Sequence, residues 1–220
     1  ITNEDYANAE PLKKSYILLK KSIAQLNCTP IITGFIGKTE QGNTTTLGRG
    51  GSDYTAAIIG NAIDAEEIQI WTDVDGILSA DPKIILKAKT IPEVSFAEAS
   101  ELAYFGAKVL HPKTILPAMQ KNIPVRVLNS FAPEKKGTLI LKNLRSQPFK
   151  IKAIAVKKAI TLIDIQSTRM LGAYGFLAKI FSIFNKYKKS VDVIATSEVS
   201  VSLTIDNQNQ ICYLVKIGLF

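Results

Sequence analysis

The chain has few of the residues that build metal centres and disulfide frameworks: its 220 residues include two cysteines and one histidine. Cys28 and Cys212 lie far apart without metal-site spacing, so we expect reduced thiols and no protein-bound metal. No apolar run approaches the ~20 residues that span a bilayer, and the N-terminus lacks a signal-peptide layout, so we expect no membrane partner. Because the first residue is Ile1 rather than Met, an upstream targeting segment would not be visible.

Acidic side chains are also scarce relative to basic ones, which gives a net charge of +8 concentrated in the last third of the chain. The lysines there occur in pairs without interleaved aromatic residues or a nucleic-acid-binding motif. We interpret them as solvated surface and expect no nucleic-acid partner. With 46% hydrophobic residues, the chain is long enough for one large domain or for one medium and one small domain.

What the sequence does have is a segment rich in glycine and hydroxyl side chains, residues 42–53 (GNTTTLGRGGSD). Its glycines allow close approach of the backbone to a ligand, and Arg49 offers a planar fork for a carboxylate. Apolar residues follow at helical spacing over 56–63, so Ser52 or Asp53 is expected to cap a helix whose N-terminus favours an anion. The alternative is a flexible polar loop, since this is not a Walker A pattern.

Residues 1–144 alternate predicted helices and strands, which indicates an α/β protein with an open sheet and helices on both faces. The predicted helices cover residues 11–26, 56–63, 95–104 and 112–121. The predicted strands cover residues 30–35, 68–72, 123–128 and 137–141, the last of them at an edge. The polar connection 142–148 is the predicted domain boundary, which separates a domain over 1–144 from one over 145–220.

The smaller domain is predicted to have the order β-α-β-β after an initial strand. Its strands are expected at 151–156, 160–166, 191–196 and 199–205, and its helix at 175–187. The remaining residues 206–220 are too few for a further helix and strand of ordinary length. We therefore expect this domain to be incomplete.

Polar residues follow the predicted strand 68–72, at the sheet edge where open α/β sheets bind ligands. Asp73 and Asp75 equally suit a solvent turn in which they satisfy only local backbone. Downstream, Lys108 follows a Gly-Ala turn that would let its ammonium reach phosphate oxygens, although a lone lysine is usually on the surface. His111 precedes a proline at a helix start and is expected to act as a cap rather than in catalysis.

Segments 44–53, 71–82 and 105–112 resemble those of aspartate kinase, a member of the amino acid kinase superfamily. Segments 167–179 and 191–203 resemble the first ACT regulatory module of that family. The resemblance implies an amino acid kinase-type sheet followed by a ferredoxin-like ACT domain. It also implies transfer of the ATP γ-phosphoryl group to the side-chain carboxylate of L-aspartate, the first step toward lysine, methionine and threonine.

The resemblance carries roles over to particular positions. The implied catalytic residues are Asp53, which would orient a lysine, and Lys108. The implied substrate-binding residues are Thr45, Arg49, Gly50, Gly51 and Ser52. The implied nucleotide-binding residues are Thr72, Asp73, Gly76, Lys83 and Lys108, with Mg²⁺ carried by ATP rather than by protein carboxylates.

The sequence departs from the family in two places. Family members carry a Lys-Phe-Gly-Gly-Ser/Thr segment near the N-terminus, and none occurs here, so we expect the chain to lack the N-terminal part of the kinase domain and to be inactive alone. Leu78 and Lys83 stand where the family often has tyrosine and arginine, which puts adenine stacking and bidentate phosphate contact in doubt.

The ACT-like segment implies an amino-acid effector and a homodimer formed through ACT domains. The pattern at 167–172 is closer to the lysine-inhibited type than to the threonine-inhibited type, so L-lysine is the expected effector. The implied effector-binding residues are Met170, Ala173, Gly175, Phe176, Leu177, Val191, Asp192, Thr196, Ser197 and Glu198. Three of these, Met170, Phe176 and Leu177, are equally consistent with plain core packing.

Two other functions compete with this interpretation. Another amino acid kinase, such as glutamate 5-kinase, acetylglutamate kinase or uridylate kinase, would share the nucleotide strand but not the substrate loop. A non-catalytic, amino-acid-sensing regulatory subunit or a truncated remnant would account for the missing lysine segment. The expected location is the cytoplasm, or the plastid if an upstream transit peptide exists.

Overall fold

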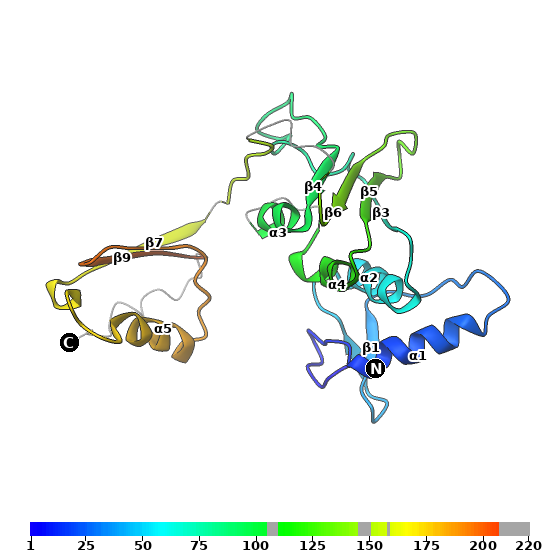
Figure 1. Ribbon diagram of the computed structural model, residues 1–220, viewed down its shortest axis with the longest axis horizontal. Helices are drawn as coiled ribbons and strands as arrows, with labels where there is room; N and C mark the ends of the chain where they lie inside the picture. The colour runs from blue at the N-terminus through cyan, green and yellow to red at the C-terminus, as the bar shows by residue number, and fades with distance from the viewer. Residues whose placement is uncertain (105–109, 145–150, 158, 207–220) are drawn as a thin grey trace. The chain divides into compact units, whose positions relative to one another are not determined.

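The computed structural model describes residues 1–104, 110–144, 151–157 and 159–206 (Figure 1). The chain divides into two compact units, Ile1–Val156 and Lys157–Phe220. Within the described residues, no helix is both long enough and apolar enough to cross a membrane.

The first unit contains a small hairpin and a four-stranded mixed sheet. Its helices are α1 (Lys13–Ala24), α2 (Gly51–Ile63), α3 (Phe96–Tyr104), the 3-10 helix η1 (Pro112–Ile115) and α4 (Leu116–Lys121). Its strands are β1 (Ile36–Lys38), β2 (Thr44–Thr46), β3 (Ile68–Thr72), β4 (Glu93–Ser95), β5 (Val125–Asn129) and β6 (Thr138–Leu141). β1 and β2 pair antiparallel, and the larger sheet has the order β3-β5-β6-β4, in which only β5 and β6 run antiparallel. The predicted open α/β sheet is confirmed.

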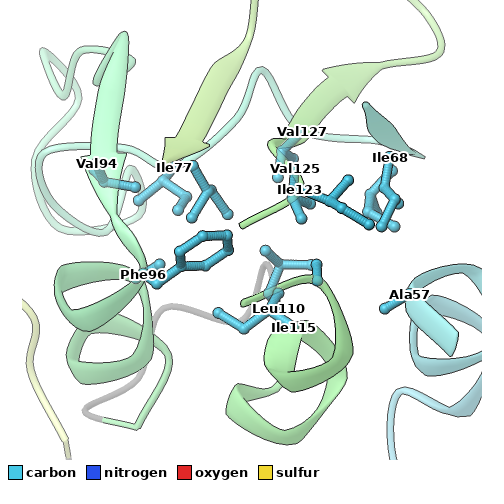
Figure 2. Packing of buried hydrophobic residues seen from close by; sticks show 14 of the residues in the cluster. Ala57, Ile68, Ile77, Val94, Phe96, Leu110, Ile115, Ile123, Val125 and Val127 are labelled. Carbon is cyan, nitrogen blue, oxygen red and sulfur yellow. The ribbon is translucent and has the colours of Figure 1, made fainter. Parts of the chain in front are cut away.

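The main core of this unit lies between the four-stranded sheet and its helices. Along β3, Ile68 and Ile70 are buried while Gln69 and Trp71 are exposed, so the strand buries one face, as its period of two requires. Figure 2 shows α2, α3 and η1 on the same side of the sheet, with Phe96 of α3 among the buried side chains. Burial of this apolar face is the main source of the unit's stability.

A second cluster joins α1 to α2. Tyr54 and Ile58 of α2 are buried together with Ala9 and Leu47, and Tyr16 and Leu19 of α1 pack against them. Those two residues form the face of α1 that packs against this cluster, and the helix predicted over 11–26 is confirmed with slightly shorter bounds.

Local capping explains where α3 begins. The Ser95 hydroxyl accepts a hydrogen bond from the Glu98 N–H at 3.1 Å, and the Glu98 carboxylate accepts one from the Ser95 N–H at 2.7 Å. This reciprocal pair satisfies two N–H groups that the first helical turn leaves without partners. The helix predicted over 95–104 is confirmed, with its start one residue later.

Two strand predictions are wrong in this unit. Residues 30–35 form no strand, and Ile31 is fully exposed. The first strand begins only at Ile36, which pairs with Thr46. A strand needs a series of backbone hydrogen bonds to a neighbour, and within the described residues this segment has a single one, from the Leu47 N–H to the Phe35 carbonyl at 2.9 Å. β6 is not at an edge, because the three-residue strand β4 pairs with its outer side.

In the second unit, the described residues form a three-stranded antiparallel sheet on which an α-helix packs. The elements of this unit are β7 (Ile160–Gln166), the 3-10 helix η2 (Thr168–Met170), α5 (Phe176–Lys186), β8 (Ile194–Thr196) and β9 (Ser200–Asp206). β9 lies between β7 and β8, and its residues Val201, Leu203 and Ile205 pack against Ile180 and Phe184 of α5. The predicted order β-α-β-β is confirmed for these elements.

The strand predicted over 151–156 is wrong. These residues form no strand, and the Ile154 N–H donates to the Ser79 carbonyl at 2.9 Å. Lys152 forms an ion pair with Glu98 at 2.8 Å. Both contacts attach the segment to the first unit, and Ala153 packs against the core of that unit, while Ile151, Ile154 and Val156 are exposed.

Candidate active site and a second pocket

The glycine-rich segment forms a pocket of about 470 Å³ between β2 and α2. The lining residues are Phe35, Gly48, Arg49, Gly50, Gly51, Ser52 and Asp53. Helix α2 begins at Gly51 with Gly50 as its N-cap, so Ser52 and Asp53 lie in the first turn and the expected cap at either of them is wrong. The reason is that Gly50 adopts the left-handed conformation, which lets the chain turn into the helix two residues earlier than expected.

Arg49 is held between two glycines in the left-handed region. Gly48 has φ 77° and Gly50 has φ 70°. A Cβ at Gly48 would lie 2.6 Å from Asn8 Oδ1, and one at Gly50 would lie 2.7 Å from Thr114 Cγ2, so neither position accommodates a side chain without a shift. The backbone on both sides of Arg49 is therefore tightly packed, while its exposed guanidinium has no hydrogen bond or ion pair to any described residue.

Asp53 is the acidic member of this pocket. Burial raises the pKa of its carboxyl group, which is about half-buried. Within the described part of the chain, no hydrogen bond or ion pair involves this carboxylate. A partly desolvated carboxylate of this kind is suited to hold a cationic group brought to the pocket, because such a group would offset the cost of burial.

One predicted substrate residue lies away from this pocket, and one lining residue was missed. Thr45 is buried in β2, and its hydroxyl is hydrogen-bonded to that of Thr2 at 2.7 Å. Phe35 lines the pocket, although the sequence pattern predicts it as the last residue of a strand. Its apolar neighbours gave no signal that it would face a ligand site.

The carboxyl end of β3 carries the predicted nucleotide residues. The Thr72 hydroxyl donates to Asp73 Oδ1 at 3.1 Å, and Asp73 is exposed. Asp75 accepts hydrogen bonds from the Lys135 ammonium at 2.7 Å and from the Asn129 amide at 2.6 Å, and these hydrogen bonds lower its pKa. The turn interpretation, in which this carboxylate satisfies only local backbone, is wrong for Asp75, because both partners are side chains distant in the sequence. Asp73 is exposed and remains accessible to a ligand.

Two further nucleotide residues lie on the segment that follows. Gly76 has φ 117° and directly precedes the buried Ile77. Lys83 is exposed, and its backbone N–H donates to Asp81 Oδ1 at 2.8 Å. Its side-chain ammonium has no hydrogen bond or ion pair to a described residue. Lys108 lies outside the described residues. No group of three or more potential metal ligands occurs in the described ranges.

His111 caps η1. Its Nδ1 accepts a hydrogen bond from the Lys113 N–H at 3.3 Å, which confirms the predicted capping role. Burial lowers the pKa of His111, and the charges of Arg49 and Lys113 lower it further. The imidazole is therefore neutral at neutral pH, with Nδ1 as acceptor and the proton on Nε2.

The second unit has its own pocket of about 400 Å³ between the η2–α5 turn and the β8–β9 turn. The predicted effector residues that line it are Met170, Ala173, Gly175, Phe176, Leu177, Ser197 and Glu198, and further lining residues are Leu171, Gly172 and Ala178. Val191, Asp192 and Thr196 do not line it. The Asp192 side chain is only 5% exposed and forms an ion pair with Lys157 at 2.8 Å.

A glycine-rich loop that leads into a helix N-terminus is typical of anion-binding sites in α/β proteins. The chain belongs to the amino acid kinase family, whose model matches residues 7–129.

Within that family, the chain is similar to aspartokinases. It is 50% identical to aspartokinase 3, chloroplastic, from Arabidopsis thaliana, over 94% of this chain and 38% of that protein. Crystal structures of Escherichia coli aspartokinase III are 46% identical. The complex with aspartate and ADP has a TM-score of 0.78 over 94% of this chain and 47% of that one. The complex with lysine and aspartate has a TM-score of 0.75 over 93% and 46%. The chain thus spans less than half the length of these relatives.

Proposed function

We propose that this chain carries the amino-acid side of the active site of an aspartate kinase, which transfers the γ-phosphoryl group of ATP to the side-chain carboxylate of L-aspartate and forms 4-phospho-L-aspartate. The pocket around Arg49 and Asp53 is the observation that carries the proposal. Residues 1–144 would be the C-terminal portion of an amino acid kinase domain and residues 145–220 part of an ACT domain. The similarity to aspartokinases over most of this chain supports that assignment.

Both reactants of this reaction are anions, so the site must offset their repulsion and align them. The exposed guanidinium of Arg49 would bind a carboxylate of aspartate, and the Ser52 hydroxyl would help to place it. The carboxylate of Asp53 would orient a catalytic ammonium group. Fixed positive charge and alignment supply most of the rate enhancement in phosphoryl transfer.

ATP would bind from the opposite side of the reacting carboxylate, at the carboxyl end of β3. Thr72 and Asp73 would contact the nucleoside there, and Gly76 would let the following segment close over it. Lys83 and Lys108 would meet phosphate oxygens, with Mg²⁺ arriving on the nucleotide.

In the second unit, the pocket would bind L-lysine as a feedback inhibitor. The N-terminus of α5 and the carboxylate of Glu198 both border it, and they suit the carboxylate and ammonium ends of an amino acid. The similarity to a complex with lysine supports this choice. The protein would form a homodimer through this unit, and it would act in the plastid or the cytoplasm, with the chloroplastic relative favouring the plastid.

Catalysis is tested by an assay of the complete gene product that contains this chain. Purified protein is incubated with Mg-ATP, L-aspartate and hydroxylamine, because an acyl phosphate reacts with hydroxylamine to form a coloured hydroxamate. We expect hydroxamate with L-aspartate and none with L-glutamate. The variant Arg49→Met should raise KM for aspartate by about tenfold or more, since a charge-assisted contact is lost.

The control is Lys20→Met. Lys20 lies in α1 and forms an exposed ion pair with Asp64, so this variant also removes one cation but away from the pocket. It should leave KM unchanged. Phosphorylation of glutamate and not aspartate would refute the substrate assignment. L-lysine binding by calorimetry without any phosphoryl transfer would instead support the regulatory-subunit alternative.

The effector assignment is tested on the same protein by calorimetry with L-lysine and L-threonine. We expect lysine to bind and Glu198→Gln to weaken it, whereas Glu66→Gln, at an exposed position in the first unit, should have no effect. Binding of threonine but not lysine would show that the effector is wrong.

A further inference from the structure

Lys113 connects three segments that surround the glycine loop. It lies in η1, and its side chain is 17% exposed. Its ammonium donates to Asn8 Oδ1 at 3.0 Å and lies 3.3 Å from a carboxylate oxygen of Glu10. It also lies 5.5 Å from the ring centroid of Tyr54 in α2, within the range of a cation–π interaction. One cation therefore contacts the N-terminal segment and the helix that follows the loop.

Asn8 contacts both Lys113 and the glycine loop. Its Oδ1, the atom that accepts from Lys113, lies where a Cβ of Gly48 would be 2.6 Å away. The surrounding segment is fixed to β2, because the Ala9 N–H donates to the Thr46 carbonyl at 2.9 Å. Asn8 is thus held by Lys113 on one side and packed against Gly48 on the other.

The 3-10 helix η1 also supports the other side of Arg49 directly. Thr114 is buried, and its hydroxyl donates to the His111 carbonyl at 2.6 Å. A Cβ at Gly50 would lie 2.7 Å from Thr114 Cγ2 and 3.3 Å from His111 Cβ. Both glycines that flank Arg49 therefore rest on η1, one directly and one through Asn8.

We propose that Lys113 and Asn8 form a brace that positions Arg49 for the amino-acid substrate, an inference that rests on the proposed function of the Arg49 pocket. Lys113 is a positioning residue, since its ammonium is bound to Asn8 and Glu10 and does not line the pocket. An arginine holds a carboxylate well only when its backbone is fixed, because an ångström of displacement breaks the paired hydrogen bonds. The brace sets that backbone at Gly48.

The test uses Lys113→Met in the complete gene product, because methionine keeps most of the apolar stem and removes the donor. We expect KM for aspartate to rise about five- to tenfold while kcat and KM for ATP change less than about twofold. Asn8→Ala should give the same increase, and the double variant should add little to it because both changes break one contact. Lys113→Arg should restore most of the aspartate affinity.

The matched control is Lys121→Met. Lys121 forms an ion pair with Asp64 and donates to the Asn61 carbonyl at 2.7 Å, at the opposite end of α2. It should not change KM for aspartate. Equal KM values for Lys113→Met and wild type, or an equal rise in Lys121→Met, would refute the brace.

Hydrogen exchange separates this inference from the proposed function. The Gly51 N–H donates to the Gly48 carbonyl at 3.0 Å across Arg49. We expect this amide to exchange about tenfold faster in Lys113→Met and at the wild-type rate in Lys121→Met. If wild type uses no aspartate yet this difference appears, the brace stands and the substrate is wrong. If exchange is unchanged, the brace is wrong whatever the activity.

Discussion

Thr138 in β6 offers the sharpest test of how the segment that follows β3 is held in place. The residue is fully buried, and its hydroxyl accepts from the Ile77 N–H at 2.8 Å and donates to the Ile91 carbonyl at 2.7 Å. It therefore joins β6 to Ile77, which follows Gly76, and to Ile91, at the two ends of the segment that contains Lys83. Thr138→Val keeps the shape of the side chain but leaves these two backbone groups without the hydroxyl.

The expected magnitude follows from those two contacts. Leaving a buried donor or acceptor unsatisfied costs roughly 1–3 kcal/mol, so the loss of two contacts in Thr138→Val should lower the free energy of unfolding by about 2–6 kcal/mol. Thr138→Ser keeps the hydroxyl and loses one buried methyl group, which costs about 1 kcal/mol. The difference between the two variants isolates the hydrogen bonds from the packing.

Urea unfolding monitored by tryptophan fluorescence measures both variants. The chain has one tryptophan, Trp71, which lies in β3 of the same unit and so reports on its unfolding. A Thr138→Val variant that is no less stable than Thr138→Ser would refute the reasoning, because the loss would then come from packing alone.

Three further predictions concern ionisable groups. Burial raises the pKa of Asp53, so its contribution to stability is full below pH 3.8 and is lost as the pH rises through the folded-state pKa. Asp53→Asn should therefore raise the melting temperature at pH 7 while abolishing hydroxamate formation. The pKa of His111 is lowered, so stability should fall as the pH drops below 6.5, and His111→Gln should remove that dependence in melting curves. Lys157→Met takes the cation from the nearly buried carboxylate of Asp192 and should destabilise the second unit by about 3 kcal/mol, measured by exchange of its amides.

Local sequence patterns predicted most elements whose apolar period is complete within one segment. The strand expected over 68–72 has the bounds of β3, and the helix expected over 95–104 is α3, which begins one residue later. The segment 30–35 has the same apolar character and yet forms no strand. Pairing decides whether an extended segment becomes a strand, and a propensity cannot indicate which neighbour is present.

The same distinction applies to the candidate site. The stretch from Arg49 to Asp53 lines a pocket as expected, because its glycines and its helix start are encoded in adjacent residues. The contacts of Lys113 with Asn8 could not be predicted, because they join residues more than one hundred positions apart. Asp192 illustrates the converse: the resemblance to an ACT module implied an effector contact, but the carboxylate of Asp192 forms an ion pair with Lys157 and does not line the pocket.

The two pockets differ in how freely their loops can evolve. At Gly172 and Gly175, in the turn before α5, a Cβ would meet no atom within 4 Å, and only the positive φ opposes a larger residue. Asparagine or aspartate tolerates that conformation at small cost. Single substitutions at these glycines can thus add polar groups to the second pocket. The crowded loop around Arg49 cannot accept such substitutions, because a Cβ at Gly48 or Gly50 would lie too close to its neighbours. Under the proposed functions, the response to an effector at the second pocket would therefore change more readily over time than substrate binding at the first pocket.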